Sequence, residues 1–124
     1  MRLLLDTHIF LWWVKGDKRL SKISIEKIKE AEEVYMSSAS IWEIAIKMRL
    51  GKISGDINAL IQEIHNSHFL ELPVTSQHAA ATLRLLDIHR DPFDRLLLAQ
   101  SLEEDLPLLT TDGAFAPYGA AVLW

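Results

Sequence analysis

Short apolar runs alternate along this chain with segments whose apolar residues recur every three or four positions. The runs lie at residues 2–6, 34–36, 69–72, 106–111 and 120–124. Runs of this length favour buried strands, whereas three- and four-residue spacing favours helices. Strands that alternate with helices predict an α/β fold, with a mostly parallel central sheet and helices on both of its faces.

The segments between the runs predict the helices. They lie at residues 8–15, 24–32, 38–50, 57–64, 75–88 and from 92 onward. The first of them is apolar from Ile9 to Val14, so it must be buried on several sides, and we expect part of its surface to face a second chain. The last begins with Asp91 as the N-cap and Pro92 at the first helical position.

The length and composition of the chain limit the class of protein. A chain of 124 residues with 49% apolar residues is large enough for one domain with its own core, over residues 1–124. The absence of cysteine excludes disulfides, thiolate zinc sites and a cysteine nucleophile. The longest apolar run is too short to cross a membrane, and the N-terminus does not look like a signal peptide. We therefore expect a cytoplasmic protein with no membrane partner.

Four acidic residues occupy the same kind of position in this predicted fold. They are Asp6, Glu43, Asp94 and Asp112. Two of them follow apolar runs and two lie near the starts of helices. Ligands of an open parallel sheet collect at this edge, outside the carboxyl ends of the strands. Because four carboxylates would repel one another there, the pattern predicts bound divalent cations and metal-dependent chemistry on phosphate.

Each acid also has a purely local interpretation. Asp6 is placed to cap the helix that follows it. Glu43 lies three residues after Ser40, which is the spacing of a capping box. Asp94 lies in a first helical turn, where the helix dipole favours an acid, and Asp112 precedes a glycine in a turn. The four local interpretations are weaker together than singly, because all four acids are predicted at one edge of the same sheet.

Other polar residues carry less information. Asp56, Asp91 and Asp105 suit caps or loops, and the five histidines show no zinc-ligand spacing: His8, His65, His68, His78 and His89. The net charge of −4 disfavours broad binding of duplex DNA, but it does not exclude a nucleic acid as a substrate. Arg90 and Arg95 are candidates for phosphate contacts, as are Arg49 and Lys52, although any one of these cations is more simply a surface charge.

Four segments of the chain resemble the PIN domain family and, within it, the VapC toxins of type II toxin–antitoxin pairs. They read L-L-L-D-T-H at 3–8, S-S-A-S-I-W-E-I-A-I-K at 37–47, H-R-D-P-F-D-R-L-L-L-A-Q at 89–100 and L-L-T-T-D-G-A-F at 108–115. The segments match the family in order, in spacing and in the element that each occupies. The resemblance covers essentially the whole chain, and its last two segments are the most specific.

The resemblance implies a function and a set of partners. The four acids match the acidic quartet of the family, and Thr110 matches its hydroxyl residue before the fourth acid. Such PIN domains are endoribonucleases that depend on Mg²⁺ or Mn²⁺. The toxins usually form homodimers, are inhibited by a cognate antitoxin and contact DNA only through it. The apolar helix at 9–14 is then expected to contribute to the homodimer or to the groove for the antitoxin.

Two other functions remain open from the sequence. A phosphatase with an aspartyl nucleophile would use Asp6 in the same place, but that class requires a second aspartate where this chain has His8. A non-catalytic module that captures a basic peptide in an acidic pocket is the second alternative. A nucleotide-binding fold is disfavoured, because no glycine-rich loop follows the first apolar run.

Overall fold

A five-stranded sheet organises the protein. The computed structural model describes residues 1–86, 91–113, 115 and 122–123. The strands are β1 (Arg2–Leu5), β2 (Glu33–Ser37), β3 (Leu70–Leu72), β4 (Leu108–Leu109) and β5 (Val122–Leu123). They lie in the order β3-β2-β1-β4-β5, and each pair of neighbours is parallel. The predicted parallel sheet is confirmed, although β4 and β5 are shorter in the described chain than the apolar runs that contain them.

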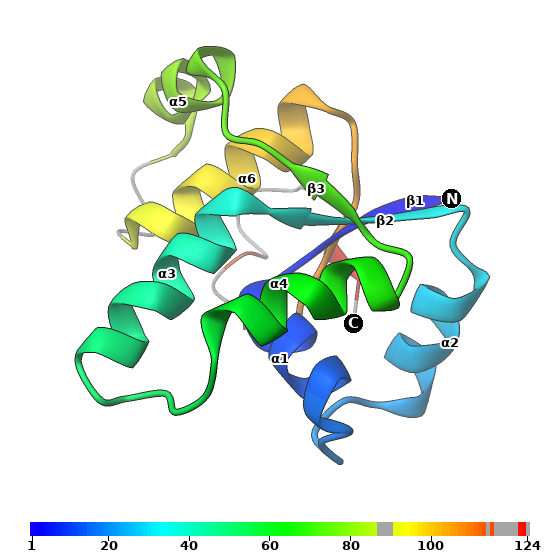
Figure 1. The fold of residues 1–124 in the computed structure, drawn as a ribbon. Coiled ribbons are helices and arrows are strands. Elements are labelled where there is room, and N and C mark those ends of the chain that lie inside the picture. Colours follow the sequence, from blue (N-terminus) through cyan, green and yellow to red (C-terminus); the bar gives the residue numbers. More distant parts are fainter. Residues whose placement is uncertain (87–90, 114, 116–121, 124) are drawn as a thin grey trace.

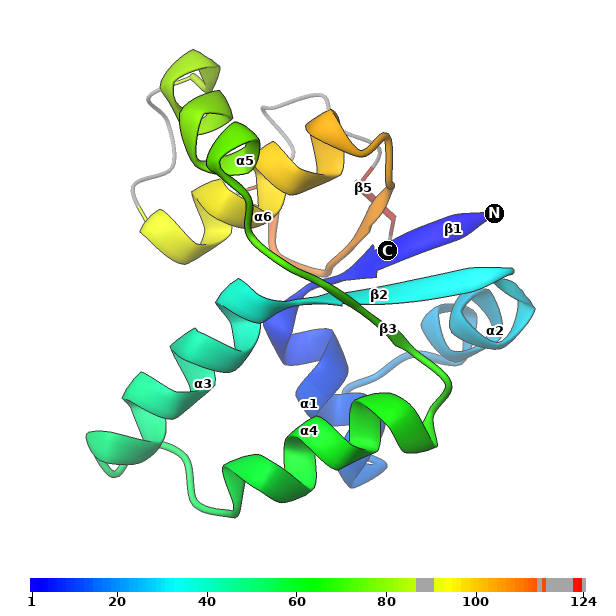
Figure 2. The same ribbon diagram turned by 45° about the horizontal axis from the view of Figure 1, so that its top comes forward.

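Helices cover both faces of this sheet, as predicted. They are α1 (Thr7–Lys15), α2 (Lys22–Glu30), α3 (Ser38–Arg49), α4 (Ile57–Asn66), α5 (Ser76–Ala81) and α6 (Pro92–Glu103). Figure 2 shows α5 and α6 on one side of the sheet, and α1, α2 and α4 on the other side. Helix α3 begins directly after β2 and extends beyond the carboxyl ends of the strands (Figure 1).

The first strand divides the core between the two faces. Leu3 and Leu5 pack into the apolar cluster beneath α1, α2 and α4, whereas Leu4 packs into the cluster against α6. All three side chains are fully buried. This alternation follows from the two-residue period of a strand, and burial on both faces explains why its three central residues, Leu3 to Leu5, are all apolar.

The helix predicted at 75–88 is shorter than expected. Helix α5 ends at Ala81 and continues as a single 3₁₀ turn, η1 (Thr82–Arg84), before the backbone becomes extended at Leu85. The guanidinium of Arg95 in α6 donates hydrogen bonds to the carbonyl oxygens of Thr82 and Leu86. Carbonyls that would continue a helix are therefore bonded to a neighbouring helix instead.

Helix α1 is less completely buried than its composition suggests. Ile9, Phe10 and Leu11 are buried, but Trp12, Trp13 and Val14 are only partly buried within the single chain. The second half of α1 therefore retains apolar surface, and the predicted contact with a second chain stays a prediction.

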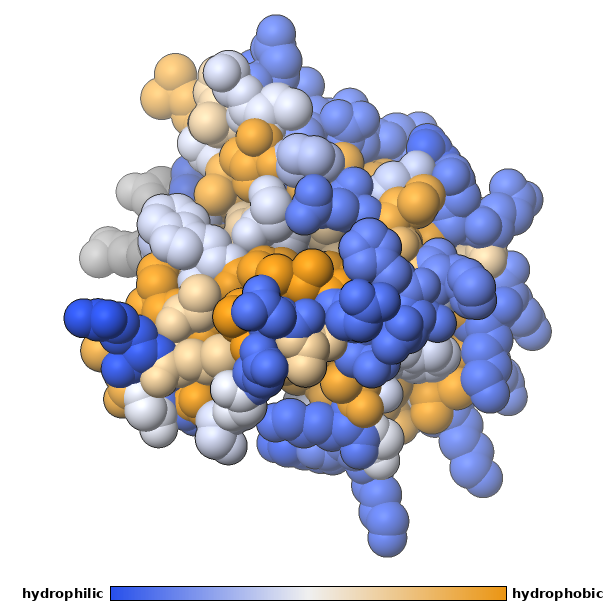
Figure 3. Space-filling model, viewed as in Figure 1, coloured by the Kyte–Doolittle hydropathy of each residue, from blue (hydrophilic) through white to orange (hydrophobic). Residues whose placement is uncertain are grey.

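The surface is mixed in character. Figure 3 shows hydrophilic side chains over α2 and apolar side chains between polar ones near the centre of the same face. The most exposed large apolar side chain in the described ranges is that of Leu83 in η1, at 90%. None of the helices in the described part of the chain is long and apolar enough to cross a membrane.

Candidate active site

The carboxyl ends of β1 and β4 place Asp6 against Thr110. The amide of Asp6 donates to the Leu109 carbonyl at 3.0 Å, which aligns the two strand ends. The Thr110 hydroxyl donates to Asp6 Oδ2 at 2.7 Å across 104 residues of sequence. Asp6 is only 4% exposed and Thr110 is fully buried, so this hydrogen bond fixes the carboxylate in a site with little access to water.

Burial gives Asp6 an unusual ionisation. Its pKa is raised above the ordinary value of 3.8, chiefly because the buried carboxylate loses hydration. The Thr110 hydrogen bond opposes this effect, and the nearby charge of Asp112 adds to it. The fold therefore holds the ionised form of Asp6 at a cost in stability, a property that is common among carboxylates at functional sites.

Thr7 connects the end of β1 to helix α3. Its hydroxyl donates to Glu43 Oε1 at 2.9 Å and lies 2.8 Å from the Ser40 hydroxyl. The other oxygen of Glu43 accepts from the ammonium of Lys47, one turn further along α3, at 3.0 Å. Glu43 is 7% exposed, and each of its oxygens is engaged. Asp6 and Glu43 are thus linked through a single intervening residue.

Thr110 also organises the fourth predicted acid. The backbone amide of Asp112 donates to the Thr110 hydroxyl oxygen at 3.0 Å, so one hydroxyl serves both Asp6 and the start of the next turn. The Asp112 side chain is exposed and affects the pKa of Asp6 by its charge. We call the set Asp6, Thr7, Glu43, Thr110 and Asp112 the acid edge.

Asp94 lies in the first turn of α6. Its backbone amide donates to Asp91 Oδ1 at 3.0 Å, so Asp91 is the N-cap, as predicted. The preceding Phe93 makes an edge-to-face ring contact with Trp42, the residue before Glu43, at 5.2 Å between centroids. This contact brings the starts of α3 and α6 together, and Asp94 is partly exposed beside it.

The structure contradicts two of the local interpretations. The Asp6 side chain makes no capping bond to α1, although its backbone occupies the N-cap position. Helix α3 begins after Ser37, whose hydroxyl accepts from the Ala39 amide at 3.0 Å. Glu43 is therefore one turn too far into the helix to form a capping box with Ser40. The acids retained as caps behave as predicted, since Asp56 caps α4 as Asp91 caps α6.

The acidic side chains in the described part of the chain do not form a complete metal-binding site. Among the described residues, no three acidic, histidine or cysteine side chains lie close enough to bind one ion as they stand. Asp6 is engaged by Thr110, and Glu43 by Thr7 and Lys47. Hydroxyl and ammonium donors thus satisfy the carboxylates that a cation would otherwise neutralise. The candidate metal ligands are carboxylate oxygens, which are the ligands that Mg²⁺ and Mn²⁺ prefer.

The structure describes only one of the two arginines that were the main candidates for phosphate contacts. The Arg95 guanidinium joins α6 to η1 and the segment after it through the carbonyls of Thr82 and Leu86, which is a structural role. Arg90 lies outside the described residues. Sequence reasoning did not identify Thr7 or Lys47, and both had a local signal: Thr7 directly follows Asp6, and Lys47 lies four residues after Glu43, which is one helical turn.

Comparison with known proteins identifies the family of the chain. The family model described as PIN domain matches residues 3–120. Ribonuclease VapC22 from Mycobacterium tuberculosis is 30% identical over 112 residues, which cover 88% of this chain and 85% of that protein.

Solved structures share the fold at lower identity. A crystal structure of VapBC2 from Rickettsia felis, bound to a DNA fragment from its promoter, superposes with a TM-score of 0.72 at 16% identity, covering 100% of this chain and 98% of the other. A toxin–antitoxin complex from Klebsiella pneumoniae gives 0.69 at 18% identity, covering 98% and 96%. The chain belongs to the PIN domain family and, within it, to the VapC proteins.

Proposed function

We propose that the protein is a metal-dependent endoribonuclease that acts as the toxin of a type II toxin–antitoxin pair. The observation that carries the proposal is the acid edge, where Asp6, buried at the carboxyl end of β1, is hydrogen-bonded to Thr110, lies near the charge of Asp112 and is linked through Thr7 to Glu43. The sequence similarity to Ribonuclease VapC22 supports RNA as the substrate. The reaction is hydrolysis of a phosphodiester bond, in which water attacks phosphorus and the bond to the leaving oxygen breaks.

The acids are suited to hold Mg²⁺ or Mn²⁺. Asp6, Glu43, Asp94 and Asp112 would supply its protein ligands, since all four offer carboxylate oxygens. The bound ion supplies a Lewis acid for the phosphate and lowers the pKa of a water nucleophile. Thr110 orients Asp6 by its hydrogen bond, and Thr7 orients Glu43 in the same way. Lys47 offsets the charge of Glu43 when no ion is bound.

The partners follow from the same family membership. The solved relatives include toxin–antitoxin complexes, one of them on promoter DNA, so we propose a cognate antitoxin as the principal protein partner. Contact with DNA would then run through the antitoxin, which agrees with the negative net charge of this chain. We further propose that the protein is a homodimer in the cytoplasm. The partly buried apolar half of α1 is one surface available for contact with the second copy or with the antitoxin.

Two nearly isosteric substitutions test the chemistry. We expect Asp6→Asn and Asp94→Asn to abolish Mn²⁺-dependent cleavage of RNA by the purified protein, because each removes a ligand charge while it preserves side-chain volume. Asp105→Asn, in an exposed loop, is the matched control and should cleave as the wild type does. Cleavage that persists in EDTA, or in both variants, would contradict the proposal. RNA binding without cleavage under any metal condition would instead favour the non-catalytic module.

A further inference from the structure

A basic pocket lies beside the acid edge, between α1 and the end of α3. It has a volume of about 370 Å³. Six of the residues that line it carry the argument: His8, Trp12, Lys15, Arg19, Lys47 and Lys52. Four of the six are permanently cationic at neutral pH, and none of the described residues that line the pocket is acidic. Such a concentration of positive charge is unexpected in a chain whose net charge is −4.

Two of these cations are available for a ligand. Within the described part of the chain, the ammonium groups of Lys15 and Lys52 take part in no ion pair. Arg19 differs, because its guanidinium binds both carboxylate oxygens of Asp17 and lowers the pKa of Asp17 to about 2. The fold therefore leaves two exposed lysines beside one hollow, neither of them in an ion pair within the described residues, although the charge of Lys15 also contributes to the lowered pKa of Asp17.

The pocket is continuous with the acid edge along two helices. His8 is two residues after Asp6 and lines the pocket. Lys47 lines it as well and binds Glu43 directly. At a rise of about 1.5 Å per residue, Lys47 lies ~6 Å beyond Glu43 along α3, and Lys15 lies ~13 Å beyond Asp6 along α1. Successive phosphates of one strand rise ~3.4 Å each in a duplex, so the pocket reaches past a single phosphate.

The pocket also contains an aromatic side chain. The Arg19 guanidinium lies over the Trp12 ring, 5.3 Å from its centroid, and the His8 ring is 6.2 Å from the same tryptophan. Proteins that hold single-stranded nucleic acids combine cations along the backbone with planar groups against which bases pack. Trp12 and Arg19 provide planar surfaces of this kind, and Lys15, Lys47 and Lys52 provide the charges.

We propose that the basic pocket binds the phosphates of single-stranded RNA next to the bond that is cut. The inference rests on the proposed ribonuclease function and assigns residues to substrate binding, with Lys15 and Lys52 as phosphate contacts. Lys47 has two functions in this arrangement: it pairs with Glu43 when no metal is bound, and it lies between the acid edge and the pocket. The pocket then fixes the direction in which the RNA strand leaves the acid edge.

A binding experiment tests this proposal without cleavage. The probe is a fluorescein-labelled single-stranded RNA of about 12 nucleotides, within the range of such sites. Its affinity is measured by anisotropy in EDTA over a series of salt concentrations, in an Asp6→Asn background that blocks turnover. The test variant carries Lys15→Gln and Lys52→Gln. The control carries Lys22→Gln and Lys29→Gln, which remove the same charge from exposed positions of α2 outside the pocket.

We expect the test pair to weaken RNA binding about 10-fold at 0.1 M salt and to reduce the slope of log affinity against log salt by roughly 1.4, or 0.7 per lost contact. The control pair should keep the parent affinity and slope. Equal losses in the two pairs, or no loss in either, would overturn the proposal. So would a test pair that binds RNA normally but loses binding of a polyglutamate peptide, because the pocket would then receive an acidic protein segment.

The result is separable from the ribonuclease assay. If the wild type cleaves RNA while the test pair binds it normally, the proposed function stands and the basic pocket is not its substrate site. If the wild type cleaves nothing but RNA binding depends on Lys15 and Lys52, the pocket is confirmed and the proposed chemistry is wrong. All four substitutions are at exposed positions, so matching unfolding midpoints will show that the variants are folded.

Discussion

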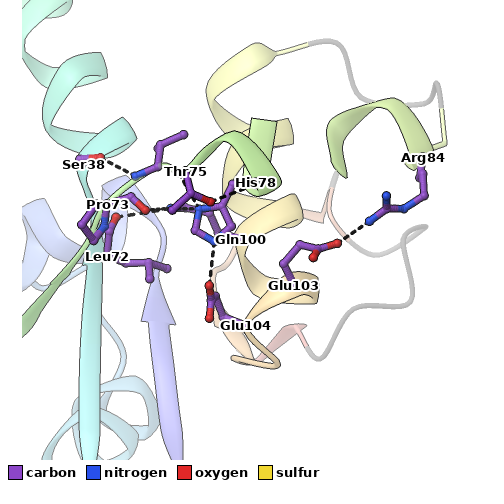
Figure 4. Close-up of polar contacts among 10 residues, drawn as sticks. Ser38, Leu72, Pro73, Thr75, His78, Arg84, Gln100, Glu103 and Glu104 are labelled. Carbon is purple, nitrogen blue, oxygen red and sulfur yellow. Dashed lines mark hydrogen bonds and ion pairs between the residues drawn. The ribbon is translucent and has the colours of Figure 1, made fainter. Parts of the chain in front are cut away.

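Two polar clusters, one at the carboxyl ends of the strands and one between α5 and α6, use hydrogen bonds for different purposes. One is the acid edge. The other, which we call the His78 cluster, joins α5 to α6 and consists of Thr75, His78, Gln100 and Glu104 (Figure 4). His78 is 1% exposed, and Gln100 is fully buried. Both clusters connect distant parts of the chain, but only the acid edge gathers groups of like charge.

The His78 cluster is built largely from complementary neutral groups. Nδ1 of His78 accepts from the Thr75 amide at 3.0 Å while the Thr75 hydroxyl accepts from the His78 amide, which closes a capping box for α5. With Nδ1 as an acceptor, Nε2 carries the proton and donates to Glu104 at 2.9 Å. Gln100 adds longer contacts, at 3.4 Å, to the carbonyls of Leu72 and Pro73. The His78–Glu104 bond joins α5 to α6, the Gln100 contacts join α6 to the end of β3, and the capping box fixes the first turn of α5.

At the acid edge, by contrast, a hydrogen bond holds one carboxylate, that of Asp6, where its charge is destabilising. Thr110 keeps Asp6 in a buried position that raises its pKa, and Asp112 adds a second negative charge nearby. A site that sacrifices stability for a particular charge arrangement is typical of functional residues. The comparison predicts that substitutions in the two clusters will have opposite effects on stability and activity.

The largest expected loss of stability lies in the His78 cluster. We expect His78→Ala to lower the free energy of unfolding by about 2–4 kcal/mol, because it leaves a cavity and strands the Thr75 amide. Urea unfolding measures this change. RNA cleavage well below the unfolding transition should stay near the wild-type rate. A His78→Ala protein with normal stability and no activity would show that the cluster belongs to the active site.

We expect Asp6→Asn to have the opposite effect, and to raise the free energy of unfolding of the metal-free protein. Because the pKa of Asp6 is raised in the folded protein, its ionisation opposes folding; this penalty is absent below the ordinary pKa and grows as the pH rises through the folded-state pKa. In EDTA at neutral pH, Asp6→Asn should therefore be more stable than the wild type, whereas a typical substitution costs about 1 kcal/mol. The advantage should vanish below about pH 3.8.

Bound Mn²⁺ should reverse this difference in stability and favour the wild type over Asp6→Asn. An ion present at 100 times its dissociation constant stabilises the native state by about 2.7 kcal/mol, and only the wild type should gain this from Mn²⁺. Thermal unfolding with and without Mn²⁺ measures both effects. Asp56→Asn is the matched control, since asparagine caps a helix as well as aspartate does. An Asp6→Asn variant that is destabilised in EDTA and keeps the metal response would place the metal site elsewhere.

Local sequence signals were sufficient for much of the fold. Asp91 with Pro92 predicted the start of α6, and the run Leu3-Leu4-Leu5 predicted a strand buried on both faces. These predictions hold because each depends on groups that are close in sequence, namely a cap and its first turn or the alternation of a strand. The positions of Asp6 directly after β1 and of Asp94 in the first turn of α6 followed from the same periodicity, whereas Glu43 lies further into α3 than a helix start.

Contacts between distant residues explain what the sequence did not show. Arg95 of α6 donates hydrogen bonds to the backbone carbonyls of Thr82 and Leu86. The helix predicted to reach residue 88 therefore stops earlier. Glu43 was interpreted as a possible partner of Ser40, but its hydrogen bonds go to Thr7 and Lys47. The basic pocket likewise draws its cations from α1, α3 and the segments that follow them. Apart from the Glu43–Lys47 pair, which lies within one helical turn, these contacts join separate elements of the fold.

The smallest expected effect on stability concerns an exposed ion pair in the α5–α6 region, in contrast to the buried hydrogen bonds of the His78 cluster. Arg84 of η1 pairs with Glu103 of α6 at the edge of the same view as the His78 cluster (Figure 4). The Arg84 side chain is 70% exposed, and that of Glu103 is 32% exposed. Water and salt screen such a pair, so we expect Arg84→Ala to change the free energy of unfolding by less than about 1 kcal/mol. A double-mutant cycle with Glu103→Ala measures the coupling, which should lie at about 0.2–1 kcal/mol and fall with added salt. A coupling as large as the loss in His78→Ala would show that this ion pair, rather than the buried hydrogen bonds, holds α5 against α6.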